Sequence, residues 1–232
     1  MSVTLQSHPT VIRLQQQGDR RPSAPGTNGA LDAAWLRQLC LEAGADDVGF
    51  VALERPELDA QRTDILQVFP QTRALISFVC RMNRAPIRSP ARSIANLEFH
   101  RVGDDTDEVG HRIVAALERH GIAALNPSVG FPMEASRFPG KTWVVSHKPV
   151  AVAAGLGQIG IHRNVIHPVF GNFILLGTVL VVAPISETSQ PIDYNPCLEC
   201  KLCVAACPVG AIGADGTFDF AACFTHNYRE FM

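Results

Sequence analysis

The sequence AVAAGLGQIGIHRN, residues 151–164, contains three glycines spaced as G-x-G-x-x-G, namely Gly155, Gly157 and Gly160. This spacing is typical of the dinucleotide-binding turn of a Rossmann fold. That turn also needs a strand before it, a helix after it and an acidic residue about twenty positions further on. Here the next acidic residue is Glu187, and Pro168 stops any helix soon after the glycines. We therefore expect no nicotinamide site. The glycines instead allow the backbone to approach a ligand closely or two elements to pack tightly.

The segments around the glycines predict a domain in which helices and strands interleave. Helices are expected over residues 31–44, 57–69 and 148–154, and strands over residues 48–53 and 73–82. An apolar hairpin or a strand is expected near residues 172–183. Residues 89–120 predict one long helix, or two helices broken near Gly103, with the acidic run 104–108 on a solvated face. The fold class is therefore α/β or α+β over residues 30–186. A disordered tail is expected over residues 1–29, and a small separate module over residues 187–232.

The composition is that of an ordinary globular protein, with 47% hydrophobic and 18% charged residues and a net charge of −2. This balance argues against an electrostatic nucleic-acid or membrane-surface partner. The longest apolar run, residues 173–185, is too short to span a bilayer and indicates a buried strand. Since the N-terminus also lacks the apolar region of a secretory signal, we expect a cytoplasmic protein.

The cysteines give the strongest signal. The run CLECKLCVAACP, residues 197–208, has the spacing C-x2-C-x2-C-x3-C-P that bacterial ferredoxins use to hold iron–sulfur clusters. Zinc is the alternative metal, but zinc sites usually separate two C-x2-C pairs by a longer interval. Cys40 and Cys80 instead lie on apolar faces of a predicted helix and strand, and we expect them to be small core residues.

The predicted iron–sulfur ligands are Cys197, Cys200, Cys203, Cys207 and Cys223. In two-cluster ferredoxins the fourth cysteine of the run, here Cys207, ligates the other cluster. Two clusters then require further thiolates, and this sequence contains no cysteine after Cys223. Two interpretations stay open. Either the sequence is a fragment of a longer protein with a second motif, or a single 4Fe-4S cluster takes Cys207 or Cys223 as its fourth ligand.

Taken together, the glycine segment and the cysteine run resemble the epoxyqueuosine reductases and, less closely, the corrinoid-dependent reductive dehalogenases. Both families pair an A-G-L-G-x-x-G segment with a C-terminal ferredoxin module. In them the glycine segment lies against the corrinoid ring and the clusters pass electrons to cobalt. The resemblance implies 4Fe-4S clusters and a cobalamin as cofactors, and it extends to Phe170-Gly171. The cofactor contacts it implies come from Gly155, Leu156, Gly157, Gly160, His162 and Asn164.

The resemblance implies an iron–sulfur oxidoreductase that passes electrons from 4Fe-4S clusters to a bound corrinoid. Its substrate is unidentified, a small molecule or a group borne on RNA, and its electron donor is a protein such as a ferredoxin or flavodoxin. Two alternatives remain: a non-catalytic ferredoxin-like electron carrier that docks a partner enzyme, and the same fold holding a flavin.

The sequence departs from the epoxyqueuosine reductases in one important place. Those enzymes carry an acidic proton donor upstream of the glycines, where this chain has Lys141, and the nearest carboxylate is Glu134. No catalytic residue is therefore assigned. His147, Lys148 and Arg163 lie close enough to the glycines to act on a ligand, and three aromatic residues could line a flat cofactor, although core packing is their commoner use. Those aromatic residues are Phe131, Phe138 and Trp143.

Overall fold

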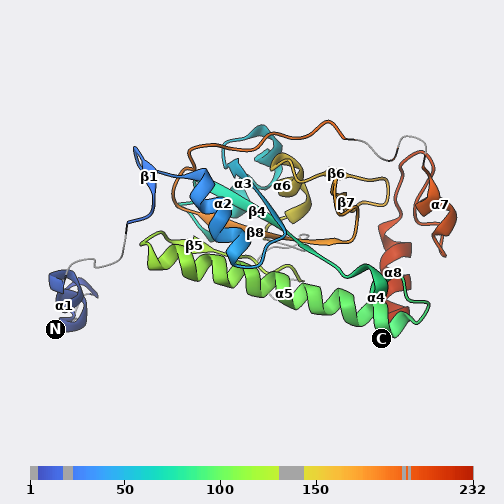
Figure 1. The fold of residues 1–232 in the computed structure, drawn as a ribbon, viewed down its shortest axis with the longest axis horizontal. Helices are drawn as coiled ribbons and strands as arrows, with labels where there is room; N and C mark the ends of the chain where they lie inside the picture. The colour runs from blue at the N-terminus through green and yellow to red at the C-terminus, as the bar shows by residue number, and fades with distance from the viewer. Residues whose placement is uncertain (1–4, 18–22, 131–143, 195–196, 198–199, 232) are drawn as a thin grey trace.

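The computed structural model describes residues 5–17, 23–130, 144–194, 197 and 200–231. Its centre is a four-stranded sheet in the order β3–β4–β8–β5, in which every neighbouring pair is antiparallel (Figure 1). The strands are β3 (Asp47–Ala52), β4 (Ala74–Arg81), β5 (Ala124–Leu125) and β8 (Ile174–Val181). The fold is thus a mixed helix-and-sheet domain, as predicted, and its antiparallel sheet makes it α+β.

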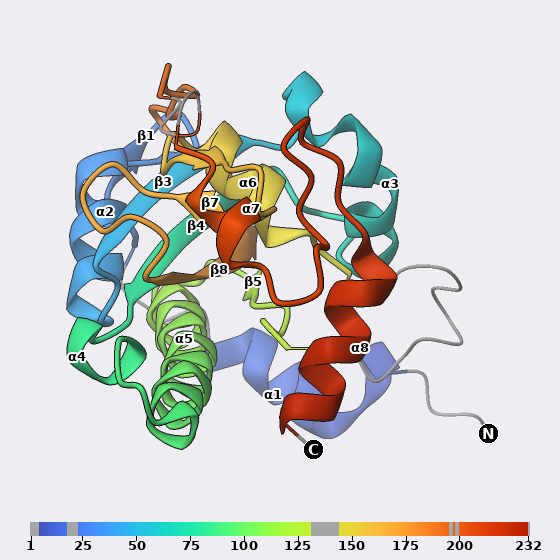
Figure 2. The same cartoon turned by 90° about the vertical axis from the view of Figure 1, so that its right-hand side faces the viewer.

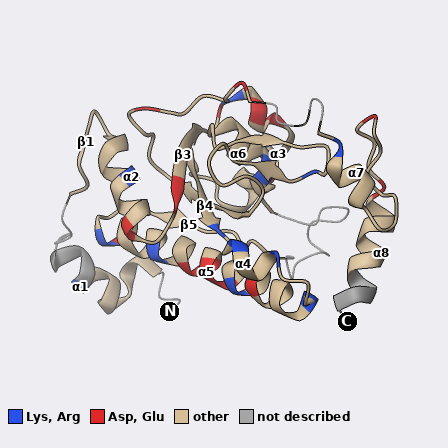
Figure 3. Cartoon of the chain, turned by 45° about the vertical axis from the view of Figure 1, so that its right-hand side comes forward, with Lys and Arg blue, Asp and Glu red and all other residues tan. Residues whose placement is uncertain are grey.

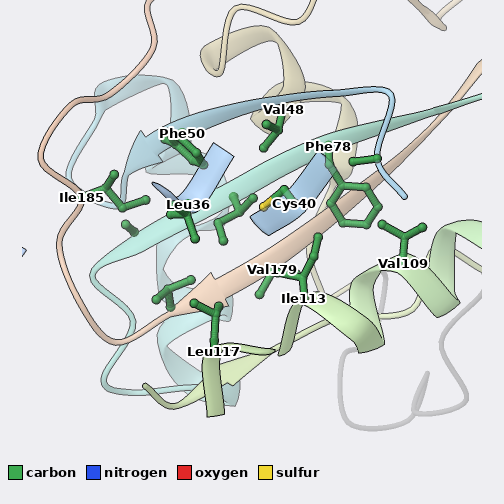
Figure 4. Packing of buried hydrophobic residues seen from close by; sticks show 14 of the residues in the cluster. Leu36, Cys40, Val48, Phe50, Phe78, Val109, Ile113, Leu117, Val179 and Ile185 are labelled. Atoms are coloured by element: carbon green, nitrogen blue, oxygen red, sulfur yellow. The ribbon is translucent and has the colours of Figure 1, made fainter. Parts of the chain in front are cut away.

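Two helices cover one face of the sheet: α2 (Ala33–Glu42) and α5 (Arg92–Arg119). Leu36 of α2 and Ile113 of α5 are fully buried against Phe78 of β4 in a common hydrophobic cluster (Figure 4). Cys40 belongs to the same cluster, and burial raises the pKa of its thiol to about 12, against a weaker effect of the nearby Arg37 charge. Cys40 is therefore a core residue, as predicted. So is Cys80, where burial raises the thiol pKa to about 11.

The opposite face is covered by the 3-10 helix η2 (Pro56–Leu58) and the helices α3 (Asp59–Val68) and α6 (His147–Ala153). Three small or polar residues lie side by side across the strands beneath α6: Gly49, Ser77 and Thr178. A Cβ atom on Gly49 would overlap the carbonyl oxygen of Ala154. The small residue therefore allows the end of α6, which leads into the glycine segment, to approach the sheet backbone.

The C-terminal residues form two helices, α7 (Leu202–Ala206) and α8 (Phe220–Phe231). Both lie at the end of the molecule where α5 begins, next to the short helix α4 (Arg84–Ile87) in Figure 1. Figure 2 views this end directly and shows α7 in front of the hairpin formed by β6 (Gln158–Ile159) and β7 (Val165–Ile166). The cysteine run and the glycine segment therefore meet at one end of the domain.

Residues 92–119 form one unbroken helix through Gly103, which is the first of the two alternatives predicted for residues 89–120. Val102, Thr106, Val109, Ile113 and Leu117 form a continuous buried stripe along it. The described part of residues 1–29 contains η1 (Leu5–Ser7), α1 (Pro9–Gln17) and β1 (Gly26–Thr27), and β1 pairs with β2 (Ala30–Leu31). These short elements are formed by hydrogen bonds between residues close in sequence, so no apolar periodicity in the sequence indicates them. No helix in the described part of the chain is both long and apolar enough to cross a membrane.

Candidate functional site

The first two glycines are required by packing within the chain. Gly155 has a φ of 73°, and a Cβ atom there would lie 2.5 Å from the carbonyl oxygen of Gln190. A Cβ atom on Gly157 would overlap the carbonyl oxygen of Ile166 and lie 2.8 Å from Cγ1 of Val165. Of the two uses expected for these glycines, tight packing of elements is the one that the structure shows.

The residues that follow form a closed turn, which we call the hairpin tip and define as residues 160–164. The backbone N–H of Gly160 donates to the carbonyl of Asn164 at 2.9 Å, and that of Arg163 donates to the carbonyl of Gly160 at 2.9 Å. Arg163 takes the left-handed conformation, with a φ of 65°. Nδ1 of His162 accepts the N–H of Asn164 at 3.1 Å. Both ends of the tip are thus fixed by its own hydrogen bonds.

Lys148 fastens the hairpin tip to α6. Its Nζ donates to the carbonyl oxygen of Arg163 at 2.7 Å and to Oδ1 of Asn164 at 3.0 Å. Burial lowers the pKa of Lys148, and the charge of Cys223 opposes that shift. Burial, reinforced by the charge of Lys148, also lowers the pKa of His162 against the effect of a backbone hydrogen bond. The tip therefore presents an imidazole whose protonation is disfavoured, next to the ammonium group of Lys148.

Direct hydrogen bonds join the hairpin to the segment that carries the cysteines. Nη2 of Arg163 donates to the carbonyl of Gly216 at 2.8 Å, and Nε2 of Gln158 donates to the carbonyl of Ile192 at 2.7 Å. Cys223 of α8 lies near enough for its charge to act on Lys148. The hairpin tip, the start of α6 and the segment that carries the cysteines (residues 187–232, the cysteine module) therefore lie next to one another. We take this region as the candidate cofactor site.

Cys207 has the electrostatic surroundings of an iron–sulfur ligand. Its Sγ accepts the backbone N–H of Ala211 at 3.2 Å. Hydrogen bonds from the backbone, led by Val209 and joined by Ala211, Ile212 and Gly210, lower the pKa of the Cys207 thiol and outweigh desolvation. A cluster is bound by thiolates, and N–H groups directed at the sulfur stabilise that form.

The other cysteines of the run lie on the turns around α7, with Cys203 in the helix itself and Cys197 and Cys200 before it. Among the described residues, which leave out 195–196 before the motif and 198–199 inside it, no three metal-binding side chains gather at one point. The donor set nevertheless fits a cluster, since thiolates at this spacing are the soft ligands that iron–sulfur chemistry uses. Cluster assembly would draw them together, as metal binding commonly does in small modules.

His147, one of the candidates near the glycines, is occupied by structural hydrogen bonds. Its Nδ1 lies 2.9 Å from Oγ1 of Thr178 and its Nε2 lies 3.2 Å from the carbonyl oxygen of Ser128. Burial lowers its pKa, against the effects of the Ser128 carbonyl and of the Asp107 charge. His147 therefore anchors α6 to Thr178, which lies in the row of small or polar residues across the sheet. The remaining sequence candidates Phe131, Phe138, Trp143, Lys141 and Glu134 lie outside the described residues.

Sequence reasoning missed His167, which organises the loop between β7 and β8. Its Nδ1 accepts the N–H groups of Val169 (3.1 Å) and Phe170 (3.3 Å), so that Nε2 carries the proton donated to Oδ2 of Asp47 at 3.0 Å. The ring of Phe170 stacks on His167, with centroids 4.7 Å apart. The loop containing Phe170 and Gly171 is thus fixed to the edge strand β3. No spacing in the sequence indicates this pairing, because Asp47 lies far away along the chain.

Comparison with known proteins gives a consistent picture. Residues 191–213 match the family model described as a 4Fe-4S binding domain. An epoxyqueuosine reductase from Gloeobacter violaceus is 30% identical over 172 residues, which cover 74% of this chain and 51% of that protein. One from Staphylococcus aureus is 36% identical over 84 residues, covering 36% of this chain and 22% of that protein. The chain therefore spans about half the length of the first relative, and less of the second.

Solved structures show the same fold. The structure of epoxyqueuosine reductase from Streptococcus thermophilus superposes with a TM-score of 0.51 at 16% identity, covering 79% of this chain and 54% of that chain. A catabolic reductive dehalogenase in complex with 3-bromo-4-hydroxybenzoic acid superposes with a TM-score of 0.65 at 19% identity, covering 86% of this chain and 29% of that chain. The resemblance predicted from the glycine segment and the cysteine run is confirmed: the chain is similar to the epoxyqueuosine reductases, matches a 4Fe-4S binding domain near its C-terminus, and has a fold like those of the epoxyqueuosine reductases and the reductive dehalogenases.

Proposed function

We propose that the chain works as an iron–sulfur reductase in which 4Fe-4S clusters pass electrons to a corrinoid held between the hairpin tip and the cysteine module. The observation that carries this proposal is the hydrogen bond from Arg163 to Gly216, which joins the glycine hairpin to the module. The homologous epoxyqueuosine reductases and the 4Fe-4S domain support an iron–sulfur oxidoreductase. A fold neighbour described in terms of B12-dependent dehalogenation supports the corrinoid.

The residues of the proposed site would have two different roles, ligation of the clusters and contact with the corrinoid. Cys197, Cys200 and Cys203 would hold a cluster, with Cys207 and Cys223 as the further ligands. A bound corrinoid would supply a cobalt centre that accepts single electrons. Among the six predicted contacts, His162 and Asn164 are accessible to a ligand, whereas Leu156, Gly157 and Gly160 are buried and Gly155 packs against Gln190. We therefore assign direct ring contact to the tip and a supporting role to the buried glycines.

The substrate and the partners remain proposals at the level of chemical class. An epoxyqueuosine reductase has been solved with an epoxyqueuosine-modified tRNA stem loop, and a reductive dehalogenase with a brominated hydroxybenzoic acid. The substrate of this chain is accordingly a small molecule or a group borne on RNA, reduced in the cytoplasm with electrons from a ferredoxin or flavodoxin.

One observation favours the alternative of a non-catalytic electron carrier. Leu202, Val209 and Phe220 expose large apolar side chains beside the cysteines, with Leu202 72% exposed. Exposed apolar residues next to a cluster suit contact with a partner protein. In this alternative the hairpin tip would only brace the module and would bind no cofactor.

Titration of the anaerobically reconstituted protein with hydroxocobalamin separates the two functions. We expect saturable binding with a change in the visible spectrum of the cobalamin. His162→Ala should weaken binding about tenfold, because it removes both a tip side chain and the acceptor that fixes Asn164.

The control is His111→Ala, which changes an exposed histidine on the distant half of α5. Its affinity for cobalamin should equal that of the unmodified protein. An absence of saturable binding in a protein that holds its clusters would favour the electron carrier. Saturable binding of FMN in place of cobalamin would favour the flavin alternative.

A further inference from the structure

A group of arginines lies at the junction of β4, α4 and α5, on other elements than those that carry the hairpin tip. Residues 81–101 contain one acidic residue, Glu98, and five exposed arginines: Arg81, Arg84, Arg88, Arg92 and Arg101. Figure 3 shows Lys and Arg residues, in blue, on α4 and on the first part of α5. The concentration of positive charge is local, since the net charge of the chain is −2.

Two of these arginines converge on a single aromatic ring. Arg84 begins α4 and Arg88 caps its end, with the N–H of Arg88 donating to the carbonyl of Arg84 at 3.0 Å. Residues four apart on a helical turn lie on the same face. The Cζ atoms of Arg84 and Arg88 lie 5.7 and 5.6 Å from the centroid of the Phe173 ring. Phe173 is itself fixed, because its carbonyl accepts the N–H of Met82 at 2.8 Å.

The nearby carboxylates are engaged elsewhere. Asp46 forms an ion pair with Arg81 at 3.0 Å, and Glu98 accepts the backbone N–H of Asn83 at 2.6 Å. Within the described residues, neither Arg84 nor Arg88 has an ion pair or a hydrogen-bonded carboxylate. Contact with the Phe173 ring offsets part of the mutual repulsion between the two guanidinium groups. A guanidinium group carries five N–H donors, so this contact leaves donors for an anion.

We propose that Arg84 and Arg88 form an anion site that binds a phosphate group of a ligand. Guanidinium edges pair with phosphate oxygens through two parallel hydrogen bonds, and Phe173 holds the two edges in place beforehand. This site does not depend on the proposed corrinoid, and it lies on other elements than the hairpin tip.

Calorimetric titration of the full chain with inorganic pyrophosphate tests the site. We expect saturable binding that the double variant Arg84→Gln/Arg88→Gln weakens at least about tenfold. Arg84→Lys/Arg88→Lys should keep an intermediate affinity, because the charges remain while the paired donors are lost. Arg73→Gln is the matched control: it changes an exposed arginine at the opposite end of β4, and it should bind pyrophosphate like the unmodified protein.

A labelled RNA hairpin, followed by fluorescence anisotropy, identifies the source of the phosphate. If the ligand is RNA, the hairpin should compete with pyrophosphate, and the double variant should reduce the slope of log K against log salt by about 1, because one phosphate contact is lost. If RNA neither binds nor competes while pyrophosphate does, the phosphate belongs to a small molecule. The proposal is overturned if the double variant binds both probes as tightly as the unmodified protein. It is also overturned if neither probe binds while an acidic polyglutamate peptide does.

Discussion

Replacing Cys200 by alanine is expected to remove most of the brown visible absorption of the anaerobically reconstituted protein. Cys200 is the second cysteine of the C-x2-C-x2-C-x3-C-P run, and loss of one thiolate leaves a cluster with an open coordination position. Iron and labile sulfide should fall together with the absorption. Visible spectroscopy with iron and sulfide analysis measures all three quantities on one sample.

Cys40→Ala is the matched control for this loss. It also removes one thiol, but that thiol belongs to α2, is fully buried, and has its pKa raised to about 12 by burial. The variant should keep the cluster and lose only about 1 kcal/mol of stability from a small cavity. Stoichiometric zinc without labile sulfide in the unmodified protein would contradict the iron–sulfur assignment.

The second large effect is expected from Gly157→Ala, which should destabilise the folded protein by about 3 kcal/mol. The added Cβ atom would overlap the carbonyl oxygen of Ile166 and press on the side chain of Val165. Both belong to β7, so the collision pushes the two strands of the hairpin apart. The free energy of unfolding, measured in urea by circular dichroism, gives this loss.

Gly171→Ala separates the collision from the cost of the backbone conformation. Gly171 has a φ of 65°, but a Cβ atom there has no neighbour within 4 Å. This variant should therefore lose only the left-handed penalty of about 1 kcal/mol. Equal losses in Gly157→Ala and Gly171→Ala would mean that the glycine segment is not packed as the structure shows.

Much of the fold follows from the sequence because its signals are local or periodic. The buried strands around Phe78 and Val179 are continuous apolar runs, and α2 and α5 carry apolar stripes at helical spacing. The direction of pairing is not local. Antiparallel registers such as Phe78 opposite Gly177 depend on a ring covering a glycine that lies far along the chain.

The candidate site divides in the same way. The cysteine run is specified by spacing alone, and so could be predicted. The role of Gly155 could not, because its neighbour Gln190 is brought there by the fold. The same holds for Lys148, whose ammonium group reaches Arg163 and Asn164 only once the hairpin has folded back on α6. The proposed phosphate site could not be predicted from the sequence for the same reason, since Phe173 and the two arginines come together only when β4 pairs with β8.

Electron transfer from the clusters to a corrinoid at the hairpin tip can be observed at both centres. The reduced protein, freed of excess reductant, is mixed with hydroxocobalamin, and the clusters and the cobalt are followed by freeze-quench electron paramagnetic resonance. We expect one Co(II) signal to appear for each cluster electron lost, at a rate that saturates with cobalamin concentration and falls in His162→Ala. A rate that rises linearly without saturation, and is the same in His162→Ala, would contradict a corrinoid site at the tip.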